Sequence, residues 1–421
     1  MPEDITYDRI VEAHERLRGG VLVTPCRESM VFSGLTGASI FCKAEYLQRT
    51  GSFKERGARN ALLLLSKEQM RRGVVAASAG NHALALAYHG RDLGIPVTVV
   101  MPVFAPLVKQ SGCRALGAEV LLSGQNIGEA KTLADVMVRE KGLTYIHGFD
   151  GADVIAGQGT LGLEILAQVP DVDVIVAPVG GAGLIAGVGL AVKTTHKHVR
   201  IVGVESHNAA SFAEAIKAGH PVSTNLKPTL ADGLAVPQVG SHAFEIAKRV
   251  VDDVVQVDEE QVAIAILRLL EIEKGVVEGA GATPLAAILG PGLPGIEGKK
   301  VVLCLCGGNI DPAILGRVIE HGLVADGRLA QFRAIISDRP GGLARFCEVI
   351  AGVGASVKQI VHERAFTSAD VSAVEVNCIV ETRNRKHVDE LMAALTDAGL
   401  TCRRDDRSFG ERLSLKHRVG P

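Results

Sequence analysis

Hydrophobic residues follow one pattern over most of the chain. From about residue 74 to residue 306, short runs of valine, isoleucine and alanine that end at glycine or proline alternate with segments of helical period, such as 106–116 and 129–141. The runs that we interpret as strands are 74–77, 97–101, 174–177, 201–204 and 301–305. Continuous apolar strands separated by helices predict parallel sheets covered by helices on both faces. We therefore expect an α/β protein with ligands at the carboxyl ends of its strands.

A second pattern begins after the stretches 291–298 and 322–328. The predicted elements there are a strand at 332–336, a helix at 342–351, strands at 356–363 and 374–380, a helix at 386–398 and a strand at 400–403. This β-α-β-β-α-β order is typical of a ferredoxin-like module. The expected organisation is a first domain over 1–325 with a smaller lobe at about 45–145, a second domain over 329–403, and a tail over 404–421.

Composition narrows the class of protein. The chain has 421 residues, of which 47% are hydrophobic, but no apolar run of membrane-spanning length, which favours a soluble protein. A net charge of −2 argues against a nucleic-acid-binding surface. The acidic start lacks the features of a secretory signal, and the eight cysteines have no paired spacing. We expect a cytoplasmic protein that binds neither nucleic acid nor membrane.

The most informative motif surrounds a lysine. Ser52 and Glu55 have the S-x-x-E spacing of a capping box, which would place Lys54 in the first turn of a helix. The helix dipole and burial against Phe53 would both disfavour the ammonium form there. A free lysine amine can form an imine with an aldehyde. A solvated surface lysine is the ordinary alternative for such a motif.

Three polar or glycine-rich loops follow predicted strands, at 78–82, 180–184 and 306–309. Such loops let backbone N–H groups converge on an anion at a helix start. The loop Gly181–Gly187 also has the spacing of a loose dinucleotide fingerprint, and Glu205 stands where a ribose-binding acid would. A nicotinamide-dependent oxidoreductase therefore stays open as an alternative, and so does simple close packing of helices.

A lysine at a helix start, an Asn-His loop and an anion cradle together suit pyridoxal 5′-phosphate, whose aldehyde bonds lysine and whose phosphate needs a helix terminus. The motifs are, in order, T-G-S-F-K-E-R-G-A, S-A-G-N-H-A, P-V-G-G-A-G-L, A-D-G-L-A-V and C-G-G-N. Over residues 5–320 the chain resembles the threonine and serine dehydratases of the fold type II pyridoxal-phosphate enzymes, which implies two parallel-sheet lobes as in the tryptophan synthase β subunit. The C-terminal part resembles an ACT regulatory domain.

The resemblance implies a role for each matching residue. Lys54 would hold the cofactor as an imine and then remove the α-proton of the substrate. Cofactor contacts would come from Phe53, Asn81, Cys306 and a phosphate loop of Gly180, Gly181, Ala182, Gly183 and Leu184. The substrate carboxylate would be held by the loop that contains Ser78, Ala79 and His82. The A-D-G-L loop, with Asp232 and Gly233, matches a family loop near the active site.

Two positions favour one reaction. A cysteine beside the pyridine nitrogen does not stabilise its protonated form, so Cys306 favours elimination over transamination. Serine racemases that resemble this chain carry a serine at the position of Ala79, and its absence favours dehydration. The resemblance implies deamination of L-threonine to 2-oxobutanoate and of L-serine to pyruvate, with a role in isoleucine biosynthesis. Alternatives are a 3-hydroxyaspartate or serine dehydratase and a non-catalytic amino-acid sensor.

Some relatives bind a divalent cation at the positions of Glu205, Ala209 and Ser211. Ser211 stands where a carboxylate is expected, so we predict no metal. In the C-terminal domain, the turn 338–342 matches ACT domains that bind amino acids between paired modules. We therefore expect an allosteric amino-acid effector and a homodimer or homotetramer.

Overall fold

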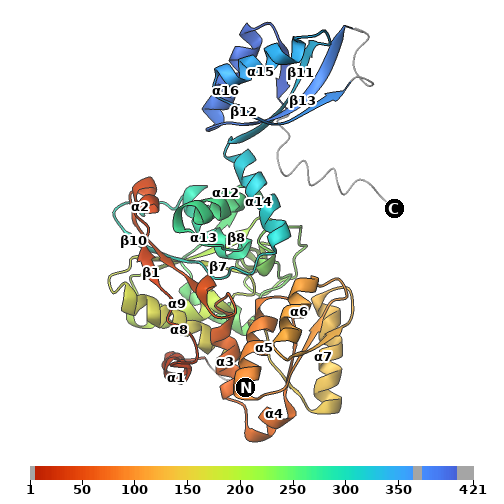
Figure 1. Ribbon diagram of the computed structural model, residues 1–421. Helices are drawn as coiled ribbons and strands as arrows, with labels where there is room; N and C mark the ends of the chain where they lie inside the picture. Colours follow the sequence, from red (N-terminus) through yellow and green to blue (C-terminus); the bar gives the residue numbers. More distant parts are fainter. Residues whose placement is uncertain (1–4, 364–371, 405–421) are drawn as a thin grey trace. The chain divides into compact units, whose positions relative to one another are not determined.

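The computed structural model describes residues 5–363 and 372–404 (Figure 1). The chain forms two compact units that divide between Asp311 and Pro312. The predicted boundary at residue 325 falls at the end of helix α14 (Pro312–Ala325), which the division assigns to the second unit. The predicted tail over 404–421 lies outside the described residues except for its first residue, which ends a strand.

The larger sheet of the first unit has six strands in the order β1-β2-β10-β7-β8-β9. Their bounds are β1 (Cys26–Glu28), β2 (Ser39–Lys43), β7 (Val174–Pro178), β8 (Arg200–Ser206), β9 (Asp253–Val257) and β10 (Lys300–Cys304). Only the pairing of β1 with β2 is antiparallel among these described strands. Every residue of β7 is buried, as expected for a parallel strand with both faces covered.

A second, four-stranded sheet has the order β5-β4-β3-β6, and all of its pairings are parallel. Its strands are β3 (Val74–Ala77), β4 (Val97–Met101), β5 (Glu119–Leu122) and β6 (Thr144–Tyr145). Val74 and Ala76 pack with one hydrophobic cluster, whereas Val75 packs with Ala130 and Ala134 on the opposite face. Both faces are therefore covered, which confirms the prediction of parallel sheets covered on both faces, apart from the antiparallel edge strand β1 of the larger sheet.

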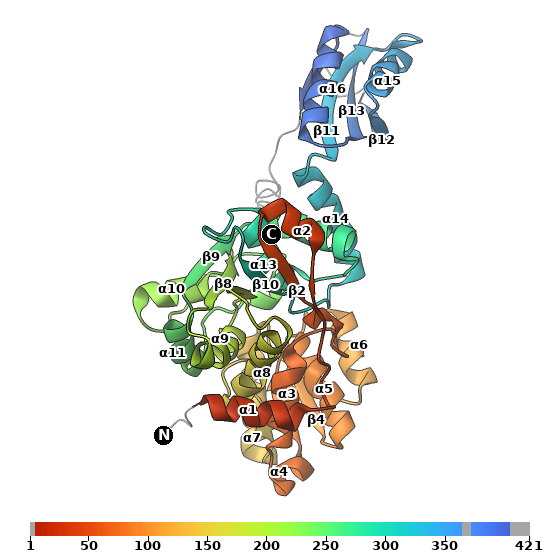
Figure 2. The same cartoon turned by 90° about the vertical axis from the view of Figure 1, so that its left-hand side faces the viewer.

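Helices surround both sheets, and Figure 2 shows α8 beside α9 next to the larger one. The helices of the first unit are α1 (Tyr7–Leu17), α2 (Met30–Thr36), α3 (Lys54–Leu63), α4 (Lys67–Arg72), α5 (Asn81–Leu93), α6 (Leu107–Ala115), α7 (Ile127–Lys141), α8 (Ala152–Gln168), α9 (Gly183–Thr195), α10 (Ser211–Ala218), α11 (Ser241–Val250), α12 (Glu259–Arg268) and α13 (Gly279–Leu289), with short turns η1 (Glu45–Leu47), η2 (Asp232–Leu234) and η3 (Leu269–Glu273). Within residues 5–363 and 372–404, no helix has the length and apolar character that crossing a membrane requires.

The second unit contains one antiparallel sheet, in the order β12-β13-β11-β14. After α14 its elements are β11 (Leu329–Ser337), α15 (Gly342–Gly352), β12 (Ser356–Glu363), β13 (Ala373–Glu381), α16 (Arg385–Asp397) and β14 (Thr401–Arg404). Alternate residues Phe332, Ala334 and Ile336 are buried and share a cluster with Phe346 of α15 and Leu391 of α16. The elements follow the predicted β-α-β-β-α-β order, with one face of the sheet packed on two helices.

Candidate active site

Lys54 is the first residue of α3, as predicted, but the predicted capping box is wrong. The residue before the helix is Phe53, and no side chain caps α3. The hydroxyl of Ser52 is buried without a hydrogen-bond partner among the described residues. The Glu55 carboxylate instead accepts a hydrogen bond from the Thr50 backbone N–H and contacts His89 Nε2 at 3.2 Å. The box fails because Ser52 pairs with Gly307 in an extended bridge, which turns the serine away from the helix start.

The Lys54 amine is buried with a single acceptor among the described residues. Its Nζ donates to the Gly148 carbonyl oxygen at 2.6 Å and lies 5.1 Å from the centre of the Phe53 ring. Burial lowers the pKa of Lys54 to about 8, and nearby Cys306 and Glu278 oppose that change. A lysine in this condition loses its proton far more readily than one in water, so it can act as a nucleophile or a base.

The glycine loop 180–184 connects β7 to α9 and leaves a buried helix start that no side chain caps. Ala182 has φ of 70°, a left-handed conformation that is uncommon for alanine, and no side chain caps the helix. A Cβ on Gly181 would lie 2.2 Å from the Phe149 ring, and one on Gly183 would lie 2.1 Å from the Phe149 carbonyl oxygen. Glycine is therefore required at both positions by close packing, which leaves backbone N–H groups to bind an anion.

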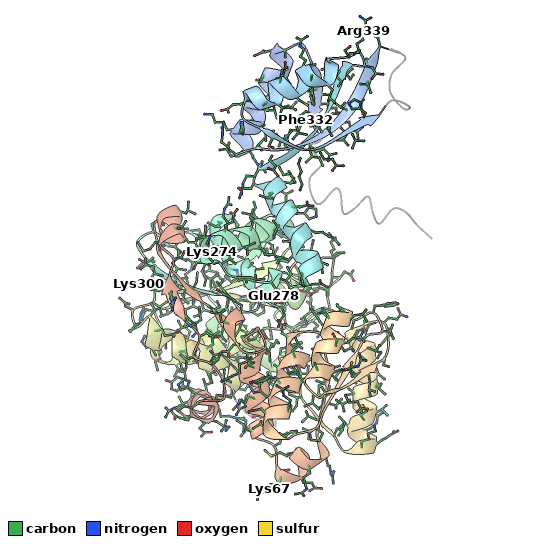
Figure 3. All side chains as sticks on the ribbon, in the orientation of Figure 1. Lys67, Lys274, Glu278, Lys300, Phe332 and Arg339 are labelled. Carbon is green, nitrogen blue, oxygen red and sulfur yellow. The ribbon has the colours of Figure 1, made fainter. Side chains whose placement is uncertain are left out.

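The side chain of Asn81 opens α5 and lies in a chain of polar contacts. Asn81 Nδ2 donates to Glu278 Oε1 at 2.7 Å, and Asn81 Oδ1 accepts from Asn309 Nδ2 at 2.8 Å. Glu278, which is labelled in Figure 3, directly precedes α13. Burial raises the pKa of Glu278 to about 7, and Asp232 adds to this.

The end of β10 brings Cys306 to the lysine. The Phe53 N–H donates to the Cys306 carbonyl oxygen at 3.0 Å, and the Gly308 N–H donates to the Gly51 carbonyl oxygen at 2.9 Å. Burial raises the pKa of the Cys306 thiol well above its usual value, and contact with Cys304 adds to this. The thiol is therefore neutral at physiological pH, as the sequence argument assumed.

The loop 78–82 leads from β3 into α5 near Lys54. His82 Nε2 lies 3.1 Å from the Ile146 carbonyl oxygen, and burial lowers the pKa of His82 to about 3. A neutral imidazole that donates to a backbone carbonyl is no cation for a carboxylate. Ser78 Oγ accepts a long hydrogen bond of 3.4 Å from the Gly80 N–H.

The side chains of Glu205 and Ser211, the residues considered for a ribose or a metal ion, lie at the start of α10. Both oxygens of Glu205 accept backbone hydrogen bonds at the start of α10, from Phe212 at 2.7 Å and from Ala213 at 2.9 Å. Ser211 Oγ is buried without a partner in the described part of the chain. No group of three histidine, cysteine or acidic side chains in the described ranges is arranged to hold a metal ion. The carboxylate that the dinucleotide alternative requires is thus already used as a helix cap.

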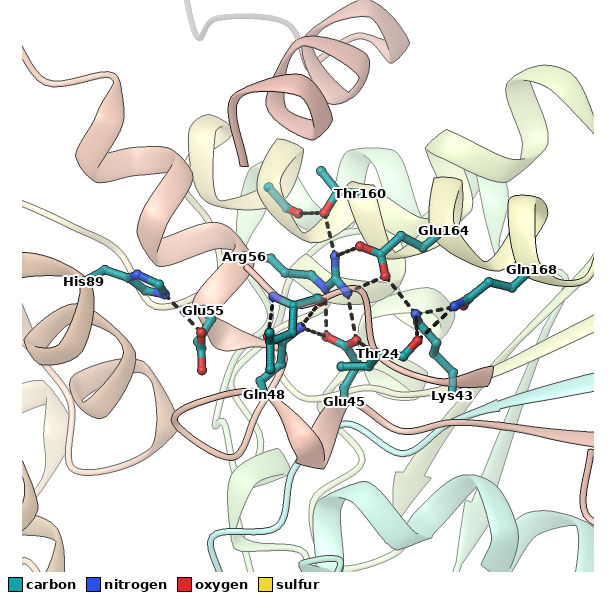
Figure 4. A network of polar contacts seen from close by, with 12 residues as sticks. Thr24, Lys43, Glu45, Gln48, Glu55, Arg56, His89, Thr160, Glu164 and Gln168 are labelled. Carbon is teal, nitrogen blue, oxygen red and sulfur yellow. Dashed lines mark hydrogen bonds and ion pairs between the residues drawn. The ribbon is translucent and has the colours of Figure 1, made fainter. Parts of the chain in front are cut away.

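A buried ion cluster surrounds Arg56, which lies two residues after Lys54 in α3 (Figure 4). The Arg56 guanidinium bonds both oxygens of Glu45 and both oxygens of Glu164, at 2.7–2.8 Å. Lys43 Nζ donates to Glu164 Oε2 at 2.7 Å. The side chains of Arg56, Lys43, Glu45 and Glu164 are each at most 6% exposed. This cluster joins β2, η1, α3 and α8, and so fixes the helix that carries Lys54.

Sequence reasoning missed Glu278 and gave Asn309 no role. Asn309 ends the C-G-G-N motif, so its proximity could have been expected from the strand end. Glu278 follows no predicted strand, and its carboxylate reaches the site only because the Glu278 N–H pairs with the Gly307 carbonyl oxygen, at 2.9 Å. The local sequence around Glu278 does not reveal this contact, so the position of Glu278 in the site could not be predicted.

A buried reactive lysine, a neutral thiol and a glycine anion cradle at the carboxyl ends of parallel strands define a pyridoxal-phosphate type of site. Residues 17–307 match the family model described as pyridoxal-phosphate dependent enzyme, and the chain belongs to that family. The structure fits the cofactor, because the free helix start at Gly183 suits a phosphate and the buried Lys54 amine suits an aldehyde.

Individual proteins are similar over most of the chain. A curated L-threonine ammonia-lyase of Thermotoga maritima is 43% identical over 399 residues, which are 95% of this chain and 99% of the relative. The processed form of threonine deaminase isoform 2 from Solanum lycopersicum has a TM-score of 0.71 and 34% identity, covering 76% of this chain and 95% of that one. Serine racemase from Dictyostelium discoideum has a TM-score of 0.69 and 35% identity, covering 73% and 99%.

Proposed function

We propose that this protein is an L-threonine ammonia-lyase that forms 2-oxobutanoate and ammonia from L-threonine, and pyruvate from L-serine. The observation that carries the proposal is the Lys54 amine, which is buried beside the neutral Cys306 thiol. The full-length similarity to an enzyme named L-threonine ammonia-lyase supports the same activity. Both agree with the activity that the sequence motifs predict.

Pyridoxal phosphate, when bound, withdraws electrons from the α-carbon of an amino acid and so weakens its α C–H bond. The loop 180–184 would hold the phosphate through backbone N–H groups, and Lys54 would carry the aldehyde carbon. With a pKa of about 8, the amine of Lys54 is poised to accept the α-proton near neutral pH. The neutral Cys306 thiol would lie near the ring nitrogen and leave it unprotonated, which would limit transamination.

The serine racemase similarity offers a second reading of the same site. Racemisation needs a proton donor on the face of the substrate opposite the lysine. Ala79 has no acidic hydrogen on its side chain, and we therefore assign dehydration to this chain. The loop 78–82 would bind the substrate carboxylate through backbone N–H groups, because the His82 imidazole is neutral and already donates to Ile146.

For the C-terminal module we propose an ACT-type regulatory role with a free amino acid as effector. The turn before α15 has Gly341 at φ of 95°, and a Cβ on Gly342 would lie 2.0 Å from the Ser337 carbonyl oxygen. This tight turn leaves the start of α15 without a side-chain cap. The match to the Thermotoga maritima relative covers 95% of the chain, so it extends into this module. Pairing of two modules would give a homodimer or homotetramer.

The activity is tested by measuring ammonia and 2-oxo acid release from L-threonine, L-serine, D-serine and 3-hydroxyaspartate. The expected order places L-threonine first and L-serine second, with no formation of D-serine from L-serine. Faster turnover of 3-hydroxyaspartate, or racemisation that exceeds dehydration, would contradict the assignment.

The effector proposal needs a separate measurement. Calorimetric titration of the full-length protein with isoleucine and with valine should give saturable heat with at least one of them. The absence of heat with both would reject the proposed effectors and leave the activity assignment intact.

A further inference from the structure

The side chain of Asn309 connects two parts of the site. Asn309 Nδ2 donates to the Thr50 carbonyl oxygen at 2.7 Å and to Asn81 Oδ1 at 2.8 Å. Thr50 lies four residues before Lys54, and Asn81 opens α5. A Cβ on Gly51 would lie 2.5 Å from Asn309 Oδ1, so the lysine loop and the amide are in close contact. One amide therefore joins the loop that precedes the lysine to the helix that starts at Asn81.

Donor and acceptor rules fix the orientation of both amides. The Thr50 carbonyl can only accept a hydrogen bond, so the nitrogen of Asn309 must face it. The same nitrogen then requires the oxygen of Asn81, which turns the Asn81 nitrogen toward the Glu278 carboxylate. That bond uses one of the two hydrogens on Asn81 Nδ2, and the second remains available.

We propose that Asn309 is a positioning residue that holds the Asn81 amide with an N–H group directed to the ring hydroxyl of the cofactor. This inference rests on the cofactor and on the proposed role of Asn81, but not on which amino acid is the substrate. A donor at the ring oxygen favours its ionised form, because a hydrogen bond to the charged form lowers the pKa of an acid. Asn309 thereby controls the protonation of the cofactor without touching it.

Among the described residues, Glu278 holds the nitrogen of the Asn81 amide and Asn309 holds its oxygen. Gly307 lies beside the Asn81 and Glu278 side chains, since a Cβ there would be 2.2 Å from Glu278 Oε1 and 3.1 Å from Asn81 Nδ2. The backbone of Asn309 also hydrogen-bonds the Glu278 carboxyl and lowers its pKa. Glu278 can only accept when ionised, so it keeps the Asn81 nitrogen in place but cannot fix the oxygen.

The test replaces the donor by an acceptor of the same shape. In Asn309→Asp a carboxylate faces the Asn81 oxygen while Glu278 still faces the Asn81 nitrogen, so either orientation of the amide brings an oxygen against a carboxylate. The amide should therefore lose its fixed direction, and its N–H should be withdrawn from the ring. We expect the pH midpoint of the visible band of the holoenzyme to rise, with about tenfold less ionised cofactor at a fixed pH, and cofactor affinity to fall about tenfold. Asn309→Ala, which adds no charge, should move both quantities in the same direction by less.

The matched control is Asn126→Asp. Asn126 caps α7 through its side-chain oxygen, a task that aspartate performs equally well, so this variant should behave as the parent protein does. An unchanged band midpoint in both Asn309 variants would overturn the proposal, even if their thermal stability or threonine turnover fell. If the parent protein binds the cofactor and the two Asn309 variants show the expected band shifts, but the parent does not deaminate threonine, only the proposed function is refuted.

Discussion

Two lysines of the first unit whose amines are buried have opposite surroundings. Lys43 donates to the Thr24 carbonyl oxygen, to Glu164 Oε2 and to Gln168 Oε1, at 2.7, 2.7 and 2.9 Å. Lys54 has only the Gly148 carbonyl oxygen among the described residues. Burial therefore does not decide by itself whether an amine becomes reactive.

The difference lies in compensation of charge. Lys43 belongs to a cluster in which the positive charges of Lys43 and Arg56 are paired with the negative charges of Glu45 and Glu164. Around Lys54 the two acids are Cys306 and Glu278, and burial raises the pKa of both. The Lys54 amine thus has little compensating charge, whereas the buried ion cluster of Lys43, Glu45, Arg56 and Glu164 is fully paired. The two sets of residues can be tested separately by mutation.

The largest expected effect follows from removing the reactive amine. Lys54→Ala should lower the rate of threonine deamination by at least about 10²–10⁴-fold, the contribution of a positioned base, and should abolish covalent attachment of the cofactor. Steady-state kinetics and the visible spectrum of the purified protein measure both. A variant that retains the parent's turnover would remove Lys54 from the mechanism.

Replacing Arg56, the cation that both carboxylates of the buried ion cluster contact, should lower the stability of the protein. Arg56→Met leaves Glu45 and Glu164 buried beside one remaining cation, and breaking such a buried pair costs about 3–5 kcal/mol. Urea unfolding of the cofactor-free protein measures the free energy of unfolding. Arg18→Met, which breaks an exposed pair with Glu15, is the matched control and should cost less than about 0.5 kcal/mol. Equal losses in both variants would show that the cluster has no special role.

The pH dependence of stability should report the Lys54 amine. Its pKa falls from 10.5 in the unfolded chain to about 8 in the folded protein, so between these values the unfolded chain binds more protons. The free energy of unfolding of the cofactor-free protein should therefore rise with pH from 8 to 10.5, by up to about 3 kcal/mol, relative to Lys54→Met. Parallel curves for the two proteins across this window would mean that the amine has an ordinary pKa.

The smallest effect is expected at Ser52. Because its hydroxyl has no partner among the described residues, Ser52→Ala should change the unfolding free energy of the cofactor-free protein by less than about 0.5 kcal/mol. Loss of a real capping serine would cost about 1 kcal/mol. Urea titration distinguishes the two values, and the larger one would restore the capping box.

Much of the architecture follows from local sequence. The apolar runs at 74–77 and 97–101 are strands with the predicted bounds, because β-branched residues bounded by breakers leave few alternatives. The glycine loop was also predictable, since it follows the apolar run 174–177 and begins a helix. The contact with Phe149, which demands its glycines, was not predictable. What the sequence conceals is the pairing of segments far apart along the chain.

The polar contacts of the site illustrate that limit. Asn81 meets Glu278 and Asn309 across separations of 197 and 228 residues, and each contact depends on how the two sheets meet. The S-x-x-E pattern at Ser52 gave a wrong prediction because a distant contact, the pairing of Ser52 with Gly307, overrides the local preference for a capping box. Tertiary contacts also decide that Glu205 caps α10.

The most direct measurement is reduction of the holoenzyme with borohydride, followed by mass mapping of the peptide that carries the cofactor. The account predicts a single modified residue, Lys54, and an unmodified Lys43 in the same digest. Reduced cofactor on Lys43 or on any other side chain, or on none, would contradict it.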